Sequence, residues 1–254
     1  MTGSPPSIRG TDCWNAILAG FQAEWPGANL DLGAQADKLS VDMREFERKL
    51  TDGSDDTSLR LWDNERQLVI SRRLSRLPGT EFATRWAEAH GFPVAVRASG
   101  GTAVVHRPGV LNISLIRVAL QPLKLSQGFD ELSDIVVRAA ARSGIALTVG
   151  KLARSYCAGT HDIGLDGRKL AGTAAVSRRH GAAYGGLFHA SLTVSGDWRH
   201  DLELISGFEQ RLGMPADYDV SAHTSLEEAF ALAARAAYSS PSLSLLGEQP
   251  NFSL

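Results

Sequence analysis

The chain has 254 residues, of which 43% are hydrophobic and 21% are charged, and its formal net charge is −2. This is the balance of a globular protein with a sizeable core, and it excludes an overall basic field that would recruit nucleic acid or an anionic membrane. Two cysteines, Cys13 and Cys157, are too few for a disulfide framework, so we expect a reducing, cytoplasmic location. We see no signal-peptide pattern, and no apolar run approaches the roughly 20 residues that span a bilayer.

The first part of the chain, residues 1–57, is expected to be an N-terminal helical extension followed by a linker. Residues 11–50 have helical hydrophobic spacing, interrupted once by a Trp-Pro-Gly turn. The polar stretch 51–57 (TDGSDDT) is the candidate linker. Residues 58–254 would then form the main domain.

Residues 58–254 show short strand-like runs mixed with a few helices, without a regular βαβ alternation. The hydrophobic spacing predicts helices at 80–90, 128–143 and 225–238. Strands are predicted at 67–71, 93–98, 103–106, 111–118, 145–149, 162–165, 168–172 and 187–194. Strands clustered in hairpins with a few helices favour an α+β fold with a mixed or antiparallel sheet.

A glycine pair separates two strand-like runs in the segment 96–106 (VRASGGTAVVH). Gly100 and Gly101 let the backbone turn sharply and approach a ligand closely. Amides exposed at such a turn can bind a phosphate or a carbonyl oxygen. A simple turn is the alternative, because glycine pairs chiefly mark turns.

The segment 155–172 combines a cysteine, a hairpin turn and a lysine. The Asp-Gly pair at 166–167 predicts a two-residue hairpin turn that places Gly164 opposite Lys169, on the strand returning toward Cys157. A lysine ammonium near a cysteine favours the thiolate, which is the nucleophilic form. The alternatives are a small buried cysteine and a solvated lysine.

The predicted strand 187–194 alternates between apolar and polar side chains. Alternation places His189 and Ser191 on one face, which can look into a cleft, and four apolar side chains on the other. A structural histidine with satisfied partners is the alternative. The seven histidines of the chain show no metal-ligand spacing, so no metal site is expected.

Together, the three segments resemble the superfamily of lipoate-protein ligase A, lipoyl (octanoyl) transferases and biotin ligases. The resemblance lies in the order Arg-x-Ser-Gly-Gly-x-Ala-Val-x-His, Gly-Arg-Lys-x-Ala-Gly and Phe-His-Ala-Ser-Leu, between about Leu61 and about Asp197. It implies a biotinyl-ligase-like α+β fold, with a mixed, mostly antiparallel sheet flanked by helices. If the segments act together, residues 97–114 and 162–194 should lie in one mixed sheet, with the Ser-Gly-Gly loop at a cleft.

The resemblance also implies the roles of individual residues. Cys157 and Lys169 would be catalytic, with Lys169 contacting the acyl carbonyl. The implied substrate-binding residues are Arg97, Ser99, Gly100, Gly101, Thr102, His106, Gly172 and His189. The chain departs from the family pattern at Thr102, where a third glycine is usual, and at Arg107, where an aspartate is common. Both departures affect the expected binding of a nucleotide more than the expected binding of an acyl group.

Two features distinguish a transferase from an ATP-dependent ligase. The segment 155–159 (SYCAG) resembles the cysteine motif of the cysteine-dependent octanoyltransferases, and ligases generally lack a cysteine there. Bacterial ligases commonly carry a C-terminal accessory domain, whereas about 57 residues follow Asp197 here, too few for a typical separate domain.

We therefore expect an octanoyl or lipoyl acyltransferase that works through an acyl-enzyme on Cys157 without a cofactor. The donor would be a thioester of acyl carrier protein or H protein, and the acceptor a lysine of a lipoyl domain or of the glycine-cleavage H protein. One alternative is an ATP-dependent lipoate-protein ligase that forms an acyl-adenylate and needs ATP and magnesium. Another is a non-catalytic acyl- or biotin-binding homologue, favoured if Cys157 is buried and inert. We expect a monomer, with no nucleic-acid or membrane partner.

Overall fold

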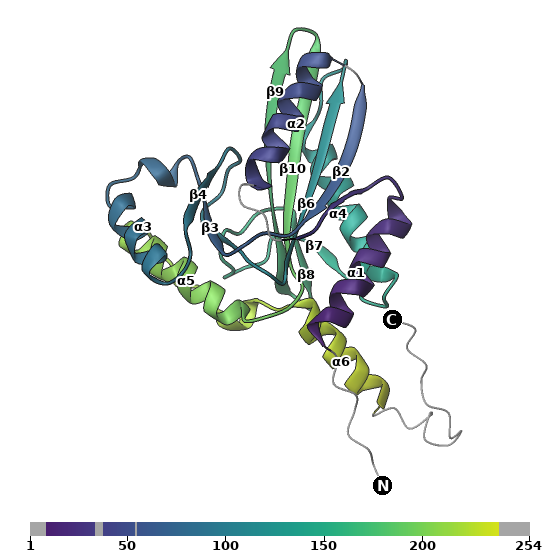
Figure 1. Ribbon diagram of the computed structural model, residues 1–254. Helices are drawn as coiled ribbons and strands as arrows, with labels where there is room; N and C mark the ends of the chain where they lie inside the picture. The colour runs from purple at the N-terminus through teal and green to yellow at the C-terminus, as the bar shows by residue number, and fades with distance from the viewer. Residues whose placement is uncertain (1–8, 34–37, 54, 239–254) are drawn as a thin grey trace, which may run out of the picture.

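The computed structural model describes residues 9–33, 38–53 and 55–238, and its fold is α+β, as predicted (Figure 1). The parts of the two expected domains at 1–8, 34–37, 54 and 239–254 lie outside the described residues. A seven-stranded sheet forms the body of the molecule, and a three-stranded sheet lies beside it. None of the described helices is both long and apolar enough to cross a membrane.

The large sheet has the spatial order β1-β2-β6-β10-β9-β8-β7. The β1–β2 pair is parallel, and the five other pairs are antiparallel, which agrees with the mostly antiparallel sheet expected from the sequence. Its strands are β1 (Asn29–Asp31), β2 (Asp56–Trp62), β6 (Val110–Ala119), β7 (Thr148–Gly150), β8 (Asp162–Leu165), β9 (Arg168–His180) and β10 (Ala183–Thr193).

Alternation on β6 and β10 gives the large sheet one face that carries the main core, and an opposite face that is polar at the cavity and apolar under α2 (Lys38–Asp52). On β10, Phe188, Ala190 and Leu192 are buried in the main core, and His189 and Ser191 point to the other face, as the sequence predicts. The apolar face is covered by α4 (Leu125–Ala141), with α1 (Gly10–Glu24) and α6 (Leu226–Tyr238) packed outside it. Helix α2 crosses the opposite face, against β6, β9 and β10 (Figure 1).

The three-stranded sheet belongs to a smaller layer with its own hydrophobic core. Strands β3 (Gln67–Ser71), β4 (Val94–Arg97) and β5 (Val104–His106) pack against α3 (Thr80–Ala89) and α5 (Trp198–Arg211). Figure 1 shows the two helices side by side on the outside of this layer. Two short 3-10 helices, η1 (Leu74–Arg76) and η2 (Val220–Ala222), complete the described elements.

The structure corrects the expectation that residues 97–114 and 162–194 share one sheet. Arg97 ends β4 in the small sheet, whereas β6 and β8 to β10 belong to the large sheet. The physical reason is that β4 pairs in parallel with β3, so its hydrogen bonds are used within the small sheet. The two sheets nevertheless approach each other, and the three sequence segments meet where they do.

Other expectations differ from the structure in detail. The stretch 51–57 is mostly not a linker, because α2 continues through Asp52 and β2 begins at Asp56. Helix α5 was not predicted, and neither were β1 and β2. The helix predicted at 80–90 is found as α3, where Ala83 and Ala87 are buried and Phe82 is 59% exposed.

The predicted hairpin between β8 and β9 is confirmed. Asp166 and Gly167 have φ values of +50° and +75°, as a type I′ turn requires at both central positions. The register places Gly164 opposite Lys169, as the two-residue turn predicts. The turn therefore fixes which residue of β9 faces the Cys157 segment.

Helices α1 and α4 approach so closely that one position on α1 must be glycine. A Cβ atom built on Gly20 would lie 2.2 Å from the carbonyl oxygen of Ala139 on α4. That contact is with backbone, which cannot rotate away, so the two helices would have to separate.

We expect Gly20→Ala to lower the free energy of unfolding by about 1–3 kcal/mol, the usual range for overpacking. Alanine gains about 1 kcal/mol of helix propensity over glycine, so the measured loss is net of that gain. Urea denaturation of the two proteins tests this. Gly27→Ala serves as the control, because its new Cβ would lie 3.9 Å from the nearest atom, Trp25 Nε1. Equal destabilisation by both substitutions would contradict the close-approach argument.

Candidate active site

A cavity of about 540 Å³ lies where the large sheet, the small sheet and helix α2 meet. Residues from all three sequence segments line it, so the predicted convergence is confirmed. The expected site residues in its lining are Arg97, Ser99, His106, Cys157, Lys169, Gly172 and His189. Gly100, Gly101 and Thr102 are not in the lining, but they form the loop that contacts Cys157.

The floor of the cavity is the polar face of the large sheet. Trp62, Asn112, Ser191 and Gly172 are paired in register across four neighbouring strands, so they form one row of this floor. The next row on the same face contains His189. Apolar side chains from the other walls complete the lining: Leu39, Met43, Ala95, Val96 and Val104.

Cys157 lines the cavity and is half-buried, so it is not the small, fully buried cysteine that the sequence left as an alternative. Its φ of +45° is in the left-handed region, which is unusual for a residue with a side chain. Its Sγ accepts a hydrogen bond from the amide of Thr102 at 3.1 Å. A hydrogen bond from a fixed amide stabilises negative charge on sulfur, and strained backbone of this kind often marks a functional position.

The side chain of Arg97 holds the Ser-Gly-Gly loop in shape. Its guanidinium donates to the carbonyl oxygens of Gly100 at 2.9 and 3.1 Å, of Thr102 at 2.8 Å and of Val69 at 3.0 Å. With the carbonyls of Gly100 and Thr102 turned toward Arg97, the Thr102 amide is free to face the sulfur. Burial lowers the pKa of Arg97, and the neighbouring Cys157 opposes that shift, so the guanidinium is also a cation beside the sulfur.

Gly101 is required at its position by both conformation and space. Its φ is +97°, and a Cβ built there would lie 2.8 Å from Arg97 Nη2 and 2.8 Å from Cys157 Sγ. A side chain would therefore enter the gap between the guanidinium and the sulfur. This gives the second glycine of the pair a packing role that a simple turn would not require.

Lys169 is 2% exposed, so the solvated alternative is excluded. Its Nζ donates to the carbonyl of Tyr156 at 2.8 Å, to the carbonyl of Cys157 at 3.2 Å and to Asp162 Oδ2 at 2.9 Å. These three bonds occupy all three ammonium donors. Lys169 thus comes to the cysteine segment, as the hairpin predicts, but it contacts the backbone carbonyl of Cys157.

His106 and Ser191 belong to a hydrogen-bonded chain in the cavity wall. His106 Nε2 lies 3.2 Å from the hydroxyl of Ser191, which donates to Asn112 Oδ1 at 2.8 Å, and Asn64 Nδ2 lies 3.5 Å from His106 Nδ1. Burial lowers the pKa of His106 to about 3, and Arg97 adds to the shift, so the imidazole is neutral. A neutral ring can accept from Asn64 and donate to Ser191 at the same time.

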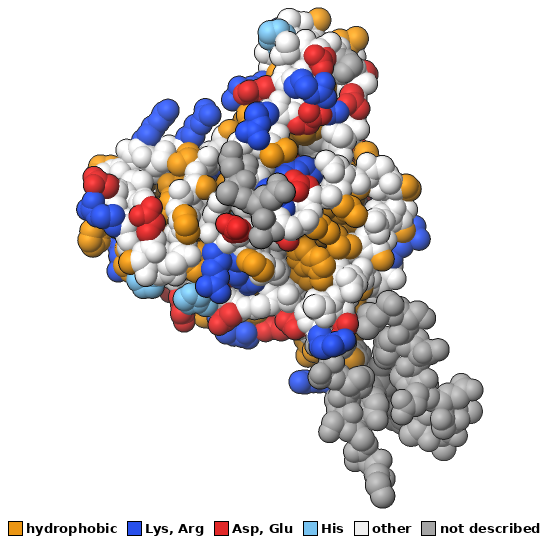
Figure 2. Space-filling view, in the orientation of Figure 1, with side chains coloured by type: hydrophobic (Ala, Val, Ile, Leu, Met, Phe, Trp, Pro, Cys, Tyr) orange, Lys and Arg blue, Asp and Glu red, His pale blue; other side chains and the backbone are white. Residues whose placement is uncertain are grey.

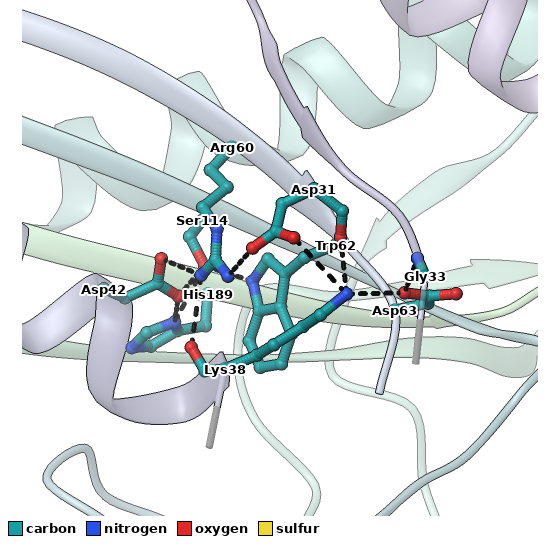
Figure 3. A network of polar contacts seen from close by, with 9 residues as sticks. All are labelled: Asp31, Gly33, Lys38, Asp42, Arg60, Trp62, Asp63, Ser114 and His189. Atoms are coloured by element: carbon teal, nitrogen blue, oxygen red, sulfur yellow. Dashed lines mark hydrogen bonds and ion pairs between the residues drawn. The ribbon is translucent and has the colours of Figure 1, made fainter. Parts of the chain in front are cut away.

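A buried ion-pair network fixes the start of α2, which roofs the cavity (Figure 3). Lys38, the first residue of α2, is 2% exposed and donates to Asp63 at 2.8 Å and to the carbonyl of Asp31 at 2.8 Å. Arg60 bonds Asp42 at 2.7 Å and also pairs with Asp31. The network therefore ties α2 to strands β1 and β2 of the large sheet.

The same network reaches the cavity through Asp42. Its Oδ2 accepts from the hydroxyl of Ser114, which also accepts from Trp62 Nε1 at 2.9 Å. His189 Nδ1 lies 3.9 Å from that carboxyl oxygen. Burial lowers the pKa of His189, and the negative charge of Asp42 opposes that shift. A residue that anchors α2 therefore also acts on the charge state of this cavity-lining ring.

The outer face of α2 is charged. Arg48 forms ion pairs with Glu45 at 2.8 Å and with Asp52 at 2.7 Å. Figure 2 shows side chains of both signs gathered over this end of the molecule. The helix is thus amphipathic, with Phe46 and Leu50 buried against the sheet.

Several residues that shape the site were not identified from the sequence. Asp162, which is 0% exposed, holds Lys169 and the amide of Gly159. Glu209 and His223 come from the chain after β10, and His223 Nε2 accepts from the amide of Tyr156 at 3.2 Å. The place of Asp162 inside the segment 155–172 could have indicated that it belongs to the site, but no local pattern points to Glu209 or His223.

Arg107, which stands where the family commonly has an aspartate, is part of a buried ion pair. It binds Asp201 on α5 through two bonds from Nε and one from Nη2, at 2.6–2.9 Å. It also donates to the carbonyl of Ser195 at 2.8 Å. In this chain the position therefore connects β5 to α5.

The matched family model is the lipoyl protein ligase A/B catalytic domain, over residues 37–212. An octanoyl-[GcvH]:protein N-octanoyltransferase of Kyrpidia tusciae is 31% identical over 208 residues, which are 75% of this chain and 69% of that protein. The protein of the same name from Geobacillus kaustophilus is 32% identical over 61% of this chain and 54% of its own length, so the match spans about half of that relative.

Solved structures agree with the fold. Lipoate-protein ligase A bound with ATP has a TM-score of 0.54 at 19% identity, covering 83% of this chain and 93% of its own. A bi-partite lipoate protein ligase from Thermoplasma acidophilum also has a TM-score of 0.54 at 19% identity, covering 88% and 98%. The fold is thus that of the biotin and lipoate ligases. The chain belongs to the lipoyl protein ligase A/B catalytic domain family.

The depressed pKa of His106 predicts how stability depends on pH. An unfolded histidine titrates near 6.5, whereas folded His106 titrates at about 3, so the unfolded chain binds the proton first. Stability should therefore fall as the pH drops from about 6.5 toward 3, by up to about 1.4 kcal/mol per pH unit for this group. We expect His106→Gln to reduce that slope in urea titrations at several pH values. The exposed His180→Gln is the control, and parallel slopes for all three proteins would contradict the assignment.

Proposed function

We propose that this protein transfers an octanoyl or lipoyl group from a carrier protein to a lysine of an acceptor protein, through a thioester on Cys157. The observation that carries this proposal is the position of Cys157 Sγ. It lines a cavity of about 540 Å³ and accepts a hydrogen bond from a fixed amide, in a chain of the lipoyl ligase A/B family. A non-catalytic binding protein would not need a cysteine held in this way.

In the first half-reaction the Cys157 thiolate adds to the carbonyl carbon of the carrier-bound acyl group. A carbon–sulfur bond forms, the bond between the acyl group and the carrier breaks, and the carrier leaves with a proton. The thiolate is stabilised by the Thr102 amide and by the positive charge of Arg97. Backbone amides of the Ser-Gly-Gly loop are the candidates for stabilising the developing oxyanion.

In the second half-reaction the ε-amine of the acceptor lysine attacks the acyl-Cys157 thioester. The amide forms, the carbon–sulfur bond breaks, and the thiol is regenerated with the proton lost by the amine. Neither half-reaction requires ATP, because the acyl group is never free.

Lys169 supports this chemistry from behind the cysteine. Its ammonium binds the Tyr156 and Cys157 carbonyls, so it fixes the conformation that presents the sulfur to the cavity. Contact with the substrate carbonyl, which the family resemblance implies, would require Lys169 to release one of its three present acceptors. We propose that substrate binding makes this exchange, while Asp162 keeps the ammonium in place.

The names of two relatives favour H protein as the donor. The proteins of Kyrpidia tusciae and Geobacillus kaustophilus are both called octanoyl-[GcvH]:protein N-octanoyltransferase. A similar Listeria monocytogenes protein is called lipoyl-[GcvH]:protein N-lipoyltransferase, which keeps the lipoyl group as a second candidate cargo. We therefore propose octanoylated H protein as the first donor to test.

Incubation of the protein with octanoylated H protein should add one octanoyl group to Cys157. Intact-mass spectrometry measures the adduct, and hydroxylamine should remove it, as expected of a thioester. Cys157→Ser is a small change at a half-buried position, so it should fold but form no thioester and lose most transfer activity. Cys13→Ser is the matched control, because Cys13 lies on the core-facing side of α1 and does not line the cavity.

The ligase alternative makes the opposite forecast for the same variant. Cys157→Ser would remain active, and activity would require free octanoate or lipoate, ATP and magnesium. Full transfer by Cys157→Ser would overturn the acyl-enzyme mechanism while leaving the family assignment intact.

The apolar part of the cavity should select the length of the acyl chain. Octanoyl has four more methylenes than butyryl, and burying each contributes about 0.8 kcal/mol, or about 3 kcal/mol in total. We therefore expect kcat/KM for octanoyl to exceed that for butyryl on the order of 100-fold. Competition between octanoyl and butyryl thioesters of one small thiol measures the ratio, and equal rates would contradict a dedicated acyl pocket.

A further inference from the structure

Glu209, in the last turn of α5, is a buried carboxylate that binds the loop beside Cys157. It is 0% exposed, so both of its oxygens depend on protein donors. Oε1 accepts from the amide of Ala103 at 3.1 Å, and Oε2 accepts from the hydroxyl of Tyr218. Burial raises the pKa of Tyr218 and the bond to Glu209 adds to the shift, so this hydroxyl remains a donor.

The bond to Ala103 acts on the peptide unit that follows Thr102. The carbonyl of Thr102 accepts from Arg97 at 2.8 Å, and the amide of Ala103, on the other side of the same planar peptide, donates to Glu209. Both polar groups of this peptide are therefore fixed. Since Thr102 carries the amide that donates to Cys157 Sγ, fixing its carboxyl side restricts where that amide points.

Tyr218 links the same carboxylate to the other side of the site. Its ring lies edge-on to Tyr156, the residue before Cys157, with ring centroids 6.5 Å apart. Glu209 and Tyr218 thus contact both segments that must align, the Ser-Gly-Gly loop through Ala103 and the cysteine segment through Tyr156. Neither residue lines the cavity.

We infer that Glu209, together with Tyr218, is a positioning residue that holds the Thr102 amide on the sulfur of Cys157. The inference rests on the proposed function in that it takes Cys157 as the nucleophile. Its chemical content is a requirement for a polar side chain at position 209 that binds the amide of Ala103 and the hydroxyl of Tyr218 at the same time. A carboxylate does this, whereas an apolar side chain of similar size can make neither bond.

The test is the pH dependence of Cys157 alkylation by iodoacetamide, with the adduct located by peptide mass spectrometry. Glu209→Leu offers no acceptor to the amide of Ala103 or to the hydroxyl of Tyr218, so the Thr102 amide should be misaligned. We expect alkylation about tenfold slower near neutral pH, because a single fixed donor of this kind is worth at least that much. Near pH 10, where thiols are ionised without help, the variant and the wild type should react equally.

Tyr218→Phe is the second variant, because it keeps the Ala103 bond and removes only the hydroxyl. We expect the same direction of change with a smaller size, about threefold near neutral pH, since one of two constraints remains. Asp201→Asn is the control for a loss of stability alone: it removes the charge of another buried carboxylate on α5, which is bound to Arg107. It should lower stability and leave the pH profile of alkylation unchanged.

A purely structural role for Glu209 predicts a different result. Glu209→Leu would then lower the melting temperature as Asp201→Asn does, with alkylation unchanged at every pH. That outcome, or wild-type profiles in both Glu209→Leu and Tyr218→Phe, would overturn the inference. Alkylation needs no acyl donor, so its outcome is independent of whether octanoylated H protein acylates the wild type, and the two proposals can fail separately.

Discussion

One buried ammonium holds the candidate active site together. Lys169 Nζ binds Asp162 and two consecutive carbonyls of the cysteine segment, those of Tyr156 and Cys157. A charge that is 2% exposed is stable only when it is paired and hydrogen-bonded, and here all three donors have acceptors. Because Lys169 binds these two carbonyls, the left-handed conformation of Cys157 is maintained and the sulfur faces the cavity.

The same constraint explains why the site lies between two sheets. The large sheet supplies Lys169 and the polar floor, whereas the small sheet supplies Arg97 and the Ser-Gly-Gly loop. Neither sheet alone contains both Lys169, which binds the Cys157 carbonyl, and the amide that faces the sulfur. The contact between Thr102 and Cys157 is therefore also a contact between the two layers.

Helix α2 closes the third side. Its start is held by buried charges, whereas Phe46 and Leu50 further along the helix pack against the sheet. Lys38 and Asp42 are almost fully buried at its start, and they pair with Asp63 and Arg60 of the neighbouring segments. Removing one partner of such a buried pair usually costs several kcal/mol, so these ion pairs fix the start of the helix firmly. The shape of the cavity thus depends on residues that precede the three sequence motifs.

The sequence by itself determined the local features with strong patterns. The Asp-Gly turn, the alternation of β10 and most helices could be predicted because each rests on contacts between near neighbours in the chain. The order of three motifs likewise indicated the family, and it made Cys157 and Lys169 candidate site residues. Residues 97–106 were nevertheless assigned to the wrong sheet, whereas residues 110–114 do lie in the large sheet. Alternation shows which face a strand buries and not which strand it pairs with.

Only the tertiary structure decided which partners complete the site. Asp42, Glu209 and His223 lie far along the chain from the groups they bind, and as single polar residues they carry no periodic signal. Their roles arise because folding removes them from water and leaves each with few possible partners. The neighbours of Cys157 in the sequence therefore indicated its candidate role. The positions of the groups around its sulfur are set by contacts between distant segments.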